Sequence, residues 1–270
     1  MNWWGSMLLA LLAVMPPALA QPDTIVYPGS AAPTDRRPGY YVGVLELALK
    51  KSGEPYRLQA SGQAMVSPRV AQQIEDRDGI NVSWWPATPD LEQHLLPIRI
   101  PIDKGMLGWR LLLIRKADRE RYAGITTLSQ LRALSAGQQR DWSDTTILRA
   151  NGLPVVPAAL YQPMFQMLAS GRFDYFPRGV GEIWNEAQQH GTLGLEIEPH
   201  LALHYPVQTY FFVNKQDTAL AQRIERGLRA AIKDGSFDAL FEQYNGDFIR
   251  RARLNSRTVF ELRNPLSSGD

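Results

Sequence analysis

One arginine, Arg178, follows a short apolar segment in a position from which it could bind a small anion. Residues 173–176 read Phe-Asp-Tyr-Phe, and a proline and a glycine flank the arginine directly after them. This pattern predicts a buried strand that ends at the guanidinium group. A guanidinium favours carboxylates, phosphates and other ligands rich in hydrogen-bond acceptors. Glu182 lies four positions further on and could pair with Arg178 instead, which would neutralise its charge.

Two histidines four positions apart form a second candidate site. His200 and His204 follow Glu196 and Glu198, and on a helix this spacing could bring two ligands to one metal ion. Pro199 interrupts the segment, however, and the HExxH order of zinc proteases is absent. The sequence also lacks a P-loop, a GxSxG elbow and a GxGxxG loop after a strand. We therefore expect no metal, no cofactor and no enzymatic activity; a hydrolytic enzyme would depend on the His/Glu cluster alone.

The composition excludes several classes of protein. The chain has 270 residues, 44% of them hydrophobic, which suits one large domain or two lobes. The formal net charge is only +2, so the chain lacks the strong positive potential that attracts nucleic acid. Cysteine is absent, so disulfides, thiolate catalysis and cysteine-based metal sites are excluded.

Residues 1–20 have the features of a secretory signal peptide. Residues 7–15 form a short apolar core, a Pro-Pro pair follows, and residues 18–20 read Ala-Leu-Ala, a small-x-small cleavage pattern. The apolar run is too short to span a bilayer comfortably. Residues 1–6 carry no lysine or arginine, which leaves an uncleaved anchor as the alternative. We expect cleavage, and a mature protein in a bacterial periplasm.

The elements that must position these residues alternate along the chain. Residues 23–27 and 79–85 have the composition of strands, and residues 41–49 place apolar side chains on one face of a helix. Two more amphipathic helices begin after Asp217 and at Ser236, near the end of the chain. Strands and helices that alternate in this way favour a parallel sheet with helical crossovers.

Three segments resemble the periplasmic solute-binding proteins of family 3, the amino-acid-binding type that serves ABC transporters. Residues 109–131 contain an apolar strand, a charged turn and a helix start. Residues 167–174 are similar to the Leu-x-x-Gly-Arg-x-Asp junction, and residues 210–246 to the family's returning strand and closing helices. The resemblance implies an α/β fold of the type II periplasmic-binding kind. Each of its two lobes is a mostly parallel sheet flanked by helices, the chain crosses twice between them, and the ligand lies in the cleft.

The same resemblance marks where this chain departs from amino-acid binders. In the family, a carboxylate a few residues after the junction Asp174 holds the ligand's ammonium group, and here Arg178 or Gly179 occupies that position. The family's arginine for the ligand carboxylate is missing after Thr88, and Arg99 is the nearest candidate. We therefore expect a small polar or anionic ligand, which could be aromatic. The expected ligand-binding residues are Tyr27, Tyr40, Trp84, Trp85, Arg99, Tyr161, Arg178 and Glu182.

The domain organisation follows from the same likeness. We expect a signal peptide over 1–20, lobe 1 over 21–110, lobe 2 over 111–212, a return to lobe 1 over 213–246, and a tail over 247–270 packed on lobe 1. The expected function is capture of a small-molecule ligand by a monomer, which passes it to a membrane permease of the ABC type. A periplasmic regulator of the same fold, acting through a sensor protein, is the alternative, because the amino-acid clamp is missing and a tail is added. Neither hypothesis involves nucleic acid.

Overall fold

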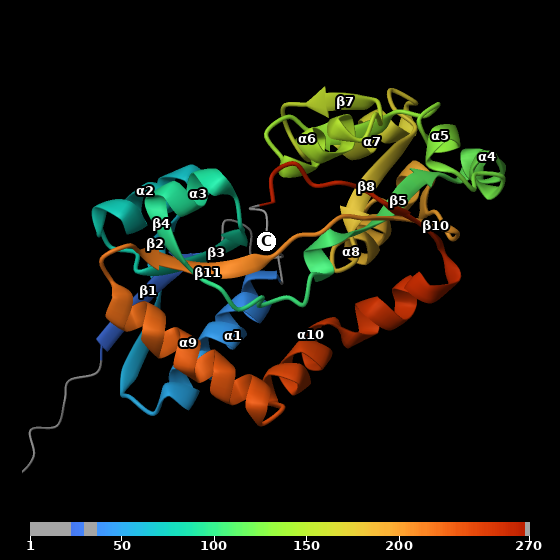
Figure 1. The fold of residues 1–270 in the computed structure, drawn as a ribbon. Coiled ribbons are helices and arrows are strands. Elements are labelled where there is room, and N and C mark those ends of the chain that lie inside the picture. The colour runs from blue at the N-terminus through green and yellow to red at the C-terminus, as the bar shows by residue number, and fades with distance from the viewer. Residues whose placement is uncertain (1–22, 30–36, 268–270) are drawn as a thin grey trace, which may run out of the picture.

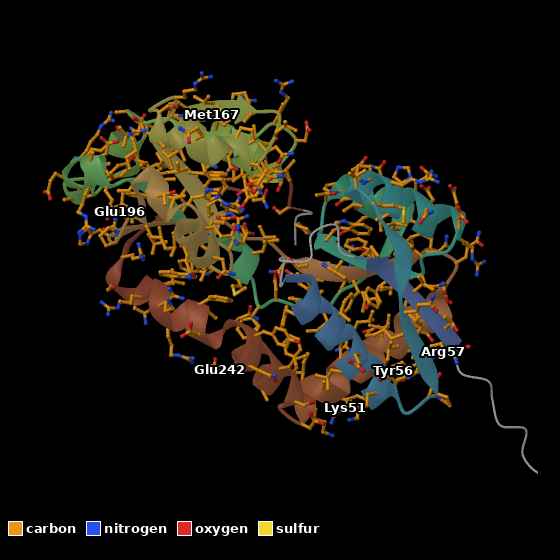
Figure 2. The ribbon with its side chains drawn as sticks, turned by 180° about the vertical axis from the view of Figure 1, so that it is seen from behind. Lys51, Tyr56, Arg57, Met167, Glu196 and Glu242 are labelled. Atoms are coloured by element: carbon orange, nitrogen blue, oxygen red, sulfur yellow. The ribbon has the colours of Figure 1, made fainter. Side chains whose placement is uncertain are left out.

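The computed structural model describes residues 23–29 and 37–267, so the predicted signal peptide lies outside the described residues. Two α/β lobes meet at a narrow waist (Figure 1). Seen from behind, Met167 and Glu196 lie on one lobe, and Lys51 and Tyr56 lie at the far end of the other (Figure 2). Within the described ranges, no helix combines the length and the apolar character needed to cross a membrane.

Lobe 1 is built from both ends of the chain. Its elements are β1 (Asp23–Gly29), α1 (Arg37–Ser52), β2 (Tyr56–Ala64), α2 (Ser67–Asp76), β3 (Val82–Pro86), α3 (Pro89–His94), β4 (Leu95–Ile98), β11 (Thr209–Asn214), α9 (Thr218–Lys233) and the first part of α10 (Ser236–Ala252). Strands β1 and β2 are parallel, and β11 lies antiparallel between β3 and β4. Asn81 joins the two groups: Val26 N donates to Asn81 Oδ1 at 2.7 Å, and Asn81 N donates to Val26 O at 2.9 Å.

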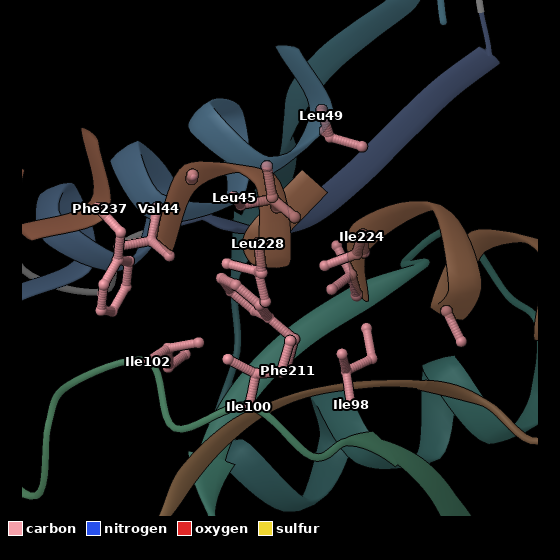
Figure 3. Packing of buried hydrophobic residues seen from close by; sticks show 14 of the residues in the cluster. Val44, Leu45, Leu49, Ile98, Ile100, Ile102, Phe211, Ile224, Leu228 and Phe237 are labelled. Atoms are coloured by element: carbon pink, nitrogen blue, oxygen red, sulfur yellow. The ribbon is translucent and has the colours of Figure 1, made fainter. Parts of the chain in front are cut away.

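The core of lobe 1 lies between its strands and helices α1 and α9. Figure 3 shows Leu45 and Leu228, one from each helix, packed near Phe211 of β11. The two helices approach closely at Gly227, where an added Cβ would lie 1.8 Å from the backbone oxygen of Ala48. This contact requires a glycine, because the opposing atom belongs to the backbone and cannot move aside.

Lobe 2 contains the middle of the chain. Its elements are β5 (Trp109–Arg115), α4 (Arg119–Ala123), α5 (Leu128–Leu131), β6 (Ala136–Gln139), α6 (Ser143–Ala150), β7 (Val155–Ala158), α7 (Pro163–Ala169), β8 (Tyr175–Gly179), α8 (Ile183–Gln189), β9 (Leu195–Ile197), β10 (Leu201–His204) and β12 (Thr258–Glu261). The sheet order is β12-β10-β5-β8-β6-β7, with β9 also paired to β5. Strands β6, β7 and β8 are parallel. The strand that we expected over residues 173–176 is displaced along the chain, since β8 begins at Tyr175 and continues past Arg178 through Gly179.

Three connections join the lobes, one more than we expected. Residues 99–108 lead from β4 to β5, and residues 205–208 lead back from β10 to β11. Helix α10 then runs below the waist, and β12 joins lobe 2 (Figure 1). Thr258 to Glu261 pair parallel with Leu201 to His204, whereas we expected this tail on lobe 1. Strand β12 thereby pairs with the backbone groups of β10 and becomes the edge of the sheet, as a strand of only four residues.

Candidate ligand-binding site

Arg178 lies in a closed ion-pair network on lobe 2. Its side chain is only 8% exposed, and those of Glu182 and Glu186 are 12% and 10% exposed. Nε donates to Glu186 Oε2 at 2.8 Å, and Nη2 donates to Glu186 Oε1 at 2.6 Å and to Glu182 Oε2. The guanidinium expected to attract an anion is therefore neutralised by two carboxylates.

Aromatic rings surround this ion pair. The guanidinium carbon of Arg178 lies 4.8 Å from the ring centroids of Trp142 and Phe176 and 5.2 Å from that of Tyr161. The hydroxyl of Tyr161 donates to Glu186 Oε1 at 2.5 Å. Burial and the charge of Glu186 raise the pKa of Tyr161 above its ordinary value, so the hydroxyl remains a donor at neutral pH. Tyr161 thus joins the network as a positioning group.

A second buried ion pair lies beside the first. Arg110, near the start of β5, donates from Nε to Asp144 Oδ1 at 2.7 Å and from Nη2 to Asp144 Oδ2 at 3.3 Å. The Tyr205 hydroxyl also donates to Asp144 Oδ1. Burial alone would raise the pKa of Asp144, but the charge and hydrogen bonds of Arg110 lower it below the ordinary value. The carboxylate therefore stays ionised while buried.

Arg110 also carries a buried nitrogen without a partner. Its Nη1 has no hydrogen bond in the described part of the chain, although the side chain is only 9% exposed. At Gly179, an added Cβ would lie 3.1 Å from this nitrogen and 3.0 Å from Glu182 Oε1. The unsatisfied donor and the carboxylate oxygen therefore pack directly over Gly179, where a methyl group would already be crowded. Gly179 occupies one of the two positions where the resemblance placed the ammonium-binding acid.

The lobe 2 cluster has no excess of positive charge. Its two guanidinium groups face three carboxylates, so five charged groups carry a formal sum of −1. Our expectation of an anionic ligand depended on a free Arg178, and this pairing removes the argument for it.

On lobe 1, three partly exposed aromatic residues form a stack at the ends of strands and the start of α1. The Trp84 ring stacks on Tyr41 with centroids 5.5 Å apart and planes 22° apart. The Tyr27 ring is tilted against Trp84, with centroids 6.5 Å apart and planes 40° apart. We call Tyr27, Tyr41 and Trp84 the aromatic stack. Its members retain some exposure, so a flat or apolar ligand could pack on them.

Three other expected residues lie elsewhere. Tyr40 is 4% exposed, and its hydroxyl donates to Ile102 O at 2.6 Å, which makes it a core residue. Trp85 points to the other face of β3 and packs on Phe212 with centroids 6.0 Å apart. Arg99 makes a bidentate pair with Glu92, at 2.6 and 3.3 Å, and its side chain is 60% exposed. The structure thus brings together Tyr27 with Trp84, and Tyr161 with Arg178 and Glu182.

The sequence interpretation missed several members of the two groups. Tyr41 escaped notice because its helical spacing is also that of a core residue. Arg110 carried a usable signal, since it is the only charged residue between Gly105 and Ile114 and so marks a buried charge in an apolar strand. Asp144 lies 34 positions away from Arg110, and no local pattern links the two.

His200 and His204 do not lie on a helix, which the metal-site hypothesis required. His204 ends β10, its ring stacks on Trp109 with centroids 4.2 Å apart, and Nδ1 lies 2.6 Å from Glu261 Oε2. Over residues 23–29 and 37–267, no group of three His, Asp or Glu side chains is placed to hold a metal ion.

Comparison with solved structures gives clear neighbours, although no protein-family model and no curated protein sequence matches the chain. The probable amino-acid ABC transporter extracellular-binding protein ytmK from Bacillus subtilis aligns with a TM-score of 0.64 at 15% identity, covering 84% of this chain and 99% of its own. A Salmonella typhimurium periplasmic binding protein with high arginine specificity aligns with a TM-score of 0.57 at 15% identity, over 82% and 99%. A histidine kinase sensor domain similar to periplasmic binding proteins gives 0.56 at 14%, over 84% and 96%. The chain therefore has the two-lobed fold of the type II periplasmic binding proteins.

Proposed function

We propose that this protein captures a small polar solute between its two lobes. The observation that carries the proposal is that each lobe of this fold has a group suited to a ligand: the aromatic stack on lobe 1 and the polar cluster on lobe 2. Both lie at the ends of sheet strands, where ligands of open α/β sheets bind. The neighbouring structures support a binding protein, because they include a transporter's binding protein and an arginine-specific one.

The chemistry of the two surfaces favours a neutral or cationic solute over an anion. The aromatic stack offers an apolar surface to a ring or to an aliphatic part. Arg110 Nη1 offers a donor that lacks an acceptor, and such a group gains most from a ligand oxygen. Glu182 Oε1 packs over the same glycine, Gly179, and is the carboxylate oxygen that we propose for an amine or hydroxyl of the solute. Arg178 holds Glu182 and Glu186 in place.

We also propose that the protein is located in the periplasm and delivers its solute to an ABC-type membrane transporter. Support comes from the apolar segment and the Ala-Leu-Ala pattern within residues 1–20. Cell fractionation with and without these residues tests the location: the full chain should be found in the periplasmic fraction, and the shortened chain should not. Capture of a sensor protein instead of a permease from membranes would support the regulatory alternative.

Solute binding is tested by a thermal-shift screen with polar solutes, including arginine and other amino acids. A solute present at 100 times its Kd stabilises the native state by about 2.7 kcal/mol, which is readily detected. For a solute that binds, Trp84→Leu should weaken affinity at least tenfold, because it removes the centre of the aromatic stack. Trp85→Leu, on the opposite face of the same strand, is the matched control and should retain the affinity. Equal affinities of the two variants would contradict the proposed site.

A further inference from the structure

A cavity lies between α10 and the start of lobe 2. Its volume is about 470 Å³, within the range of small-molecule sites, roughly 300–1,000 Å³. None of its lining residues belongs to the aromatic stack or to the lobe 2 cluster. Trp109 lines it while its neighbour Arg110 belongs to the cluster, as expected for successive residues that face opposite sides of a strand. We call this hollow the strap cavity, because α10 bridges both lobes beside it (Figure 1).

Apolar side chains form most of the wall. They come from the first connection, from both lobes and from the C-terminal segment: Met106, Trp109, Val180, Phe241, Ile249, Leu254 and Val259. Two of these side chains are aromatic and one is a methionine, a residue that adapts readily to the shape of a bound molecule. The body of a fitting ligand is therefore hydrophobic.

The charged side chains that line the cavity are both cationic. They are Lys104 and Arg257, with Asn255 as the only other polar residue and no carboxylate among the lining residues. Lys104 Nζ lies 2.7 Å from Asp238 Oδ1 and 4.9 Å from the ring centroid of Phe241. Since Asp238 is 65% exposed, this surface pair holds Lys104 only weakly.

Arg257 is the stronger indication of a ligand. Its side chain is 5% exposed, Nε donates to Ala252 O at 2.7 Å, and Nη1 donates to Glu198 O at 2.6 Å and Leu201 O at 3.0 Å. Within the described residues Nη2 makes no hydrogen bond. The Glu198 carboxylate is 3.9 Å from Nη1 and is occupied by the backbone N–H groups of His200 and Leu201. A buried guanidinium in an apolar wall, with donors to spare, is suited to an anionic head group.

We propose that the strap cavity binds a hydrophobic carboxylate, with its apolar body against Trp109 and Phe241 and its carboxylate near Arg257 or Lys104. This site is separate from the solute site between the lobes. Its walls include α10, the first connection and β12, so an occupant contacts segments that join the two lobes. A bound ligand would therefore stabilise the packing of these connecting segments.

Titration calorimetry tests the proposal with 2-naphthoate, octanoate and the uncharged 2-naphthamide. We expect one molecule of 2-naphthoate or octanoate per chain, and affinity for 2-naphthoate at least tenfold higher than for 2-naphthamide. Binding of octanoate alone would assign the cavity to aliphatic carboxylates, and binding of 2-naphthoate alone to aromatic ones. Absence of binding by both carboxylates at millimolar concentration would overturn the proposal, as would equal binding of the amide.

Variants that fill the cavity locate the site. Val259→Trp and Ile249→Trp, from different walls, should each weaken carboxylate binding at least tenfold, whereas the exposed Leu160→Trp should not. Trp84→Leu should also leave it unchanged, which separates this site from the one between the lobes. If the filling variants fail to fold, a crystal structure of the unmodified protein with 2-naphthoate decides. Density in the strap cavity supports the proposal, and density only elsewhere refutes it.

Discussion

Replacing Arg178 with methionine tests whether this arginine is a structural ion pair or a ligand-binding group. The side chains of Arg178, Glu182 and Glu186 are 8–12% exposed, so the substitution leaves two buried carboxylates without their guanidinium. Breaking a buried pair in this way costs about 3–5 kcal/mol. With a urea m value of about 2–3 kcal/mol/M, the unfolding midpoint should fall by about 1–2.5 M.

Urea unfolding at pH 7, followed by circular dichroism, measures this effect. The matched control is Arg229→Met, which breaks an exposed i,i+4 pair with Glu225 and should cost less than about 1 kcal/mol. Adding Glu186→Gln to Arg178→Met should restore part of the lost stability, because one unpaired carboxylate is removed. If Arg178→Met were as stable as the wild-type protein, the network would not hold this part of lobe 2 together, and our reasoning would be refuted.

Two further predictions concern the core of lobe 1 and the junction in lobe 2. Gly227→Ala should destabilise the protein by about 1–3 kcal/mol in thermal unfolding, because its Cβ meets the α1 backbone, whereas Gly191→Ala, with no atom within 4 Å of the added Cβ, should not. Burial alone raises the pKa of Asp174, but hydrogen bonds from Ser135 and Arg121 lower it below its ordinary value. Its ionised form therefore adds stability above about pH 4, the unfolded pKa, and this contribution disappears as the pH falls through the folded pKa. Asp174→Asn should lose about 1–3 kcal/mol at pH 7 and progressively less below pH 4; a loss independent of pH would contradict this explanation.

The helices and strands could be predicted because their patterns are local in the sequence, whereas the two-lobed arrangement was implied by the resemblance to family 3 binding proteins. Alternation over residues 79–85 separates Trp84 from Trp85, and the structure places them on opposite faces of β3 as expected. Helical spacing in the same way identifies the buried faces of α1 and α9. Such periodicities depend only on neighbours in the chain.

The pairing of charges was harder to predict, because it depends on distant segments. Pairing of Glu182 with Arg178 was foreseen as an alternative, since the two lie close in sequence. The partnership of Glu186 with the same guanidinium depends on how α8 packs beside β8. The position of β12 depends on the open edge of β10, which no pattern near Thr258 reveals.

The claim that a solute binds between the two lobes is tested most directly by measuring the distance between them. The chain has no cysteine, so spin labels attached at Asp90→Cys on α3 and Thr146→Cys on α6, both exposed, would be unique. Double electron–electron resonance should be recorded with and without the solute that gives the largest thermal shift. Binding between the lobes predicts a shorter, narrower distance distribution at saturation. An unchanged distribution with the solute fully bound would contradict capture between the lobes.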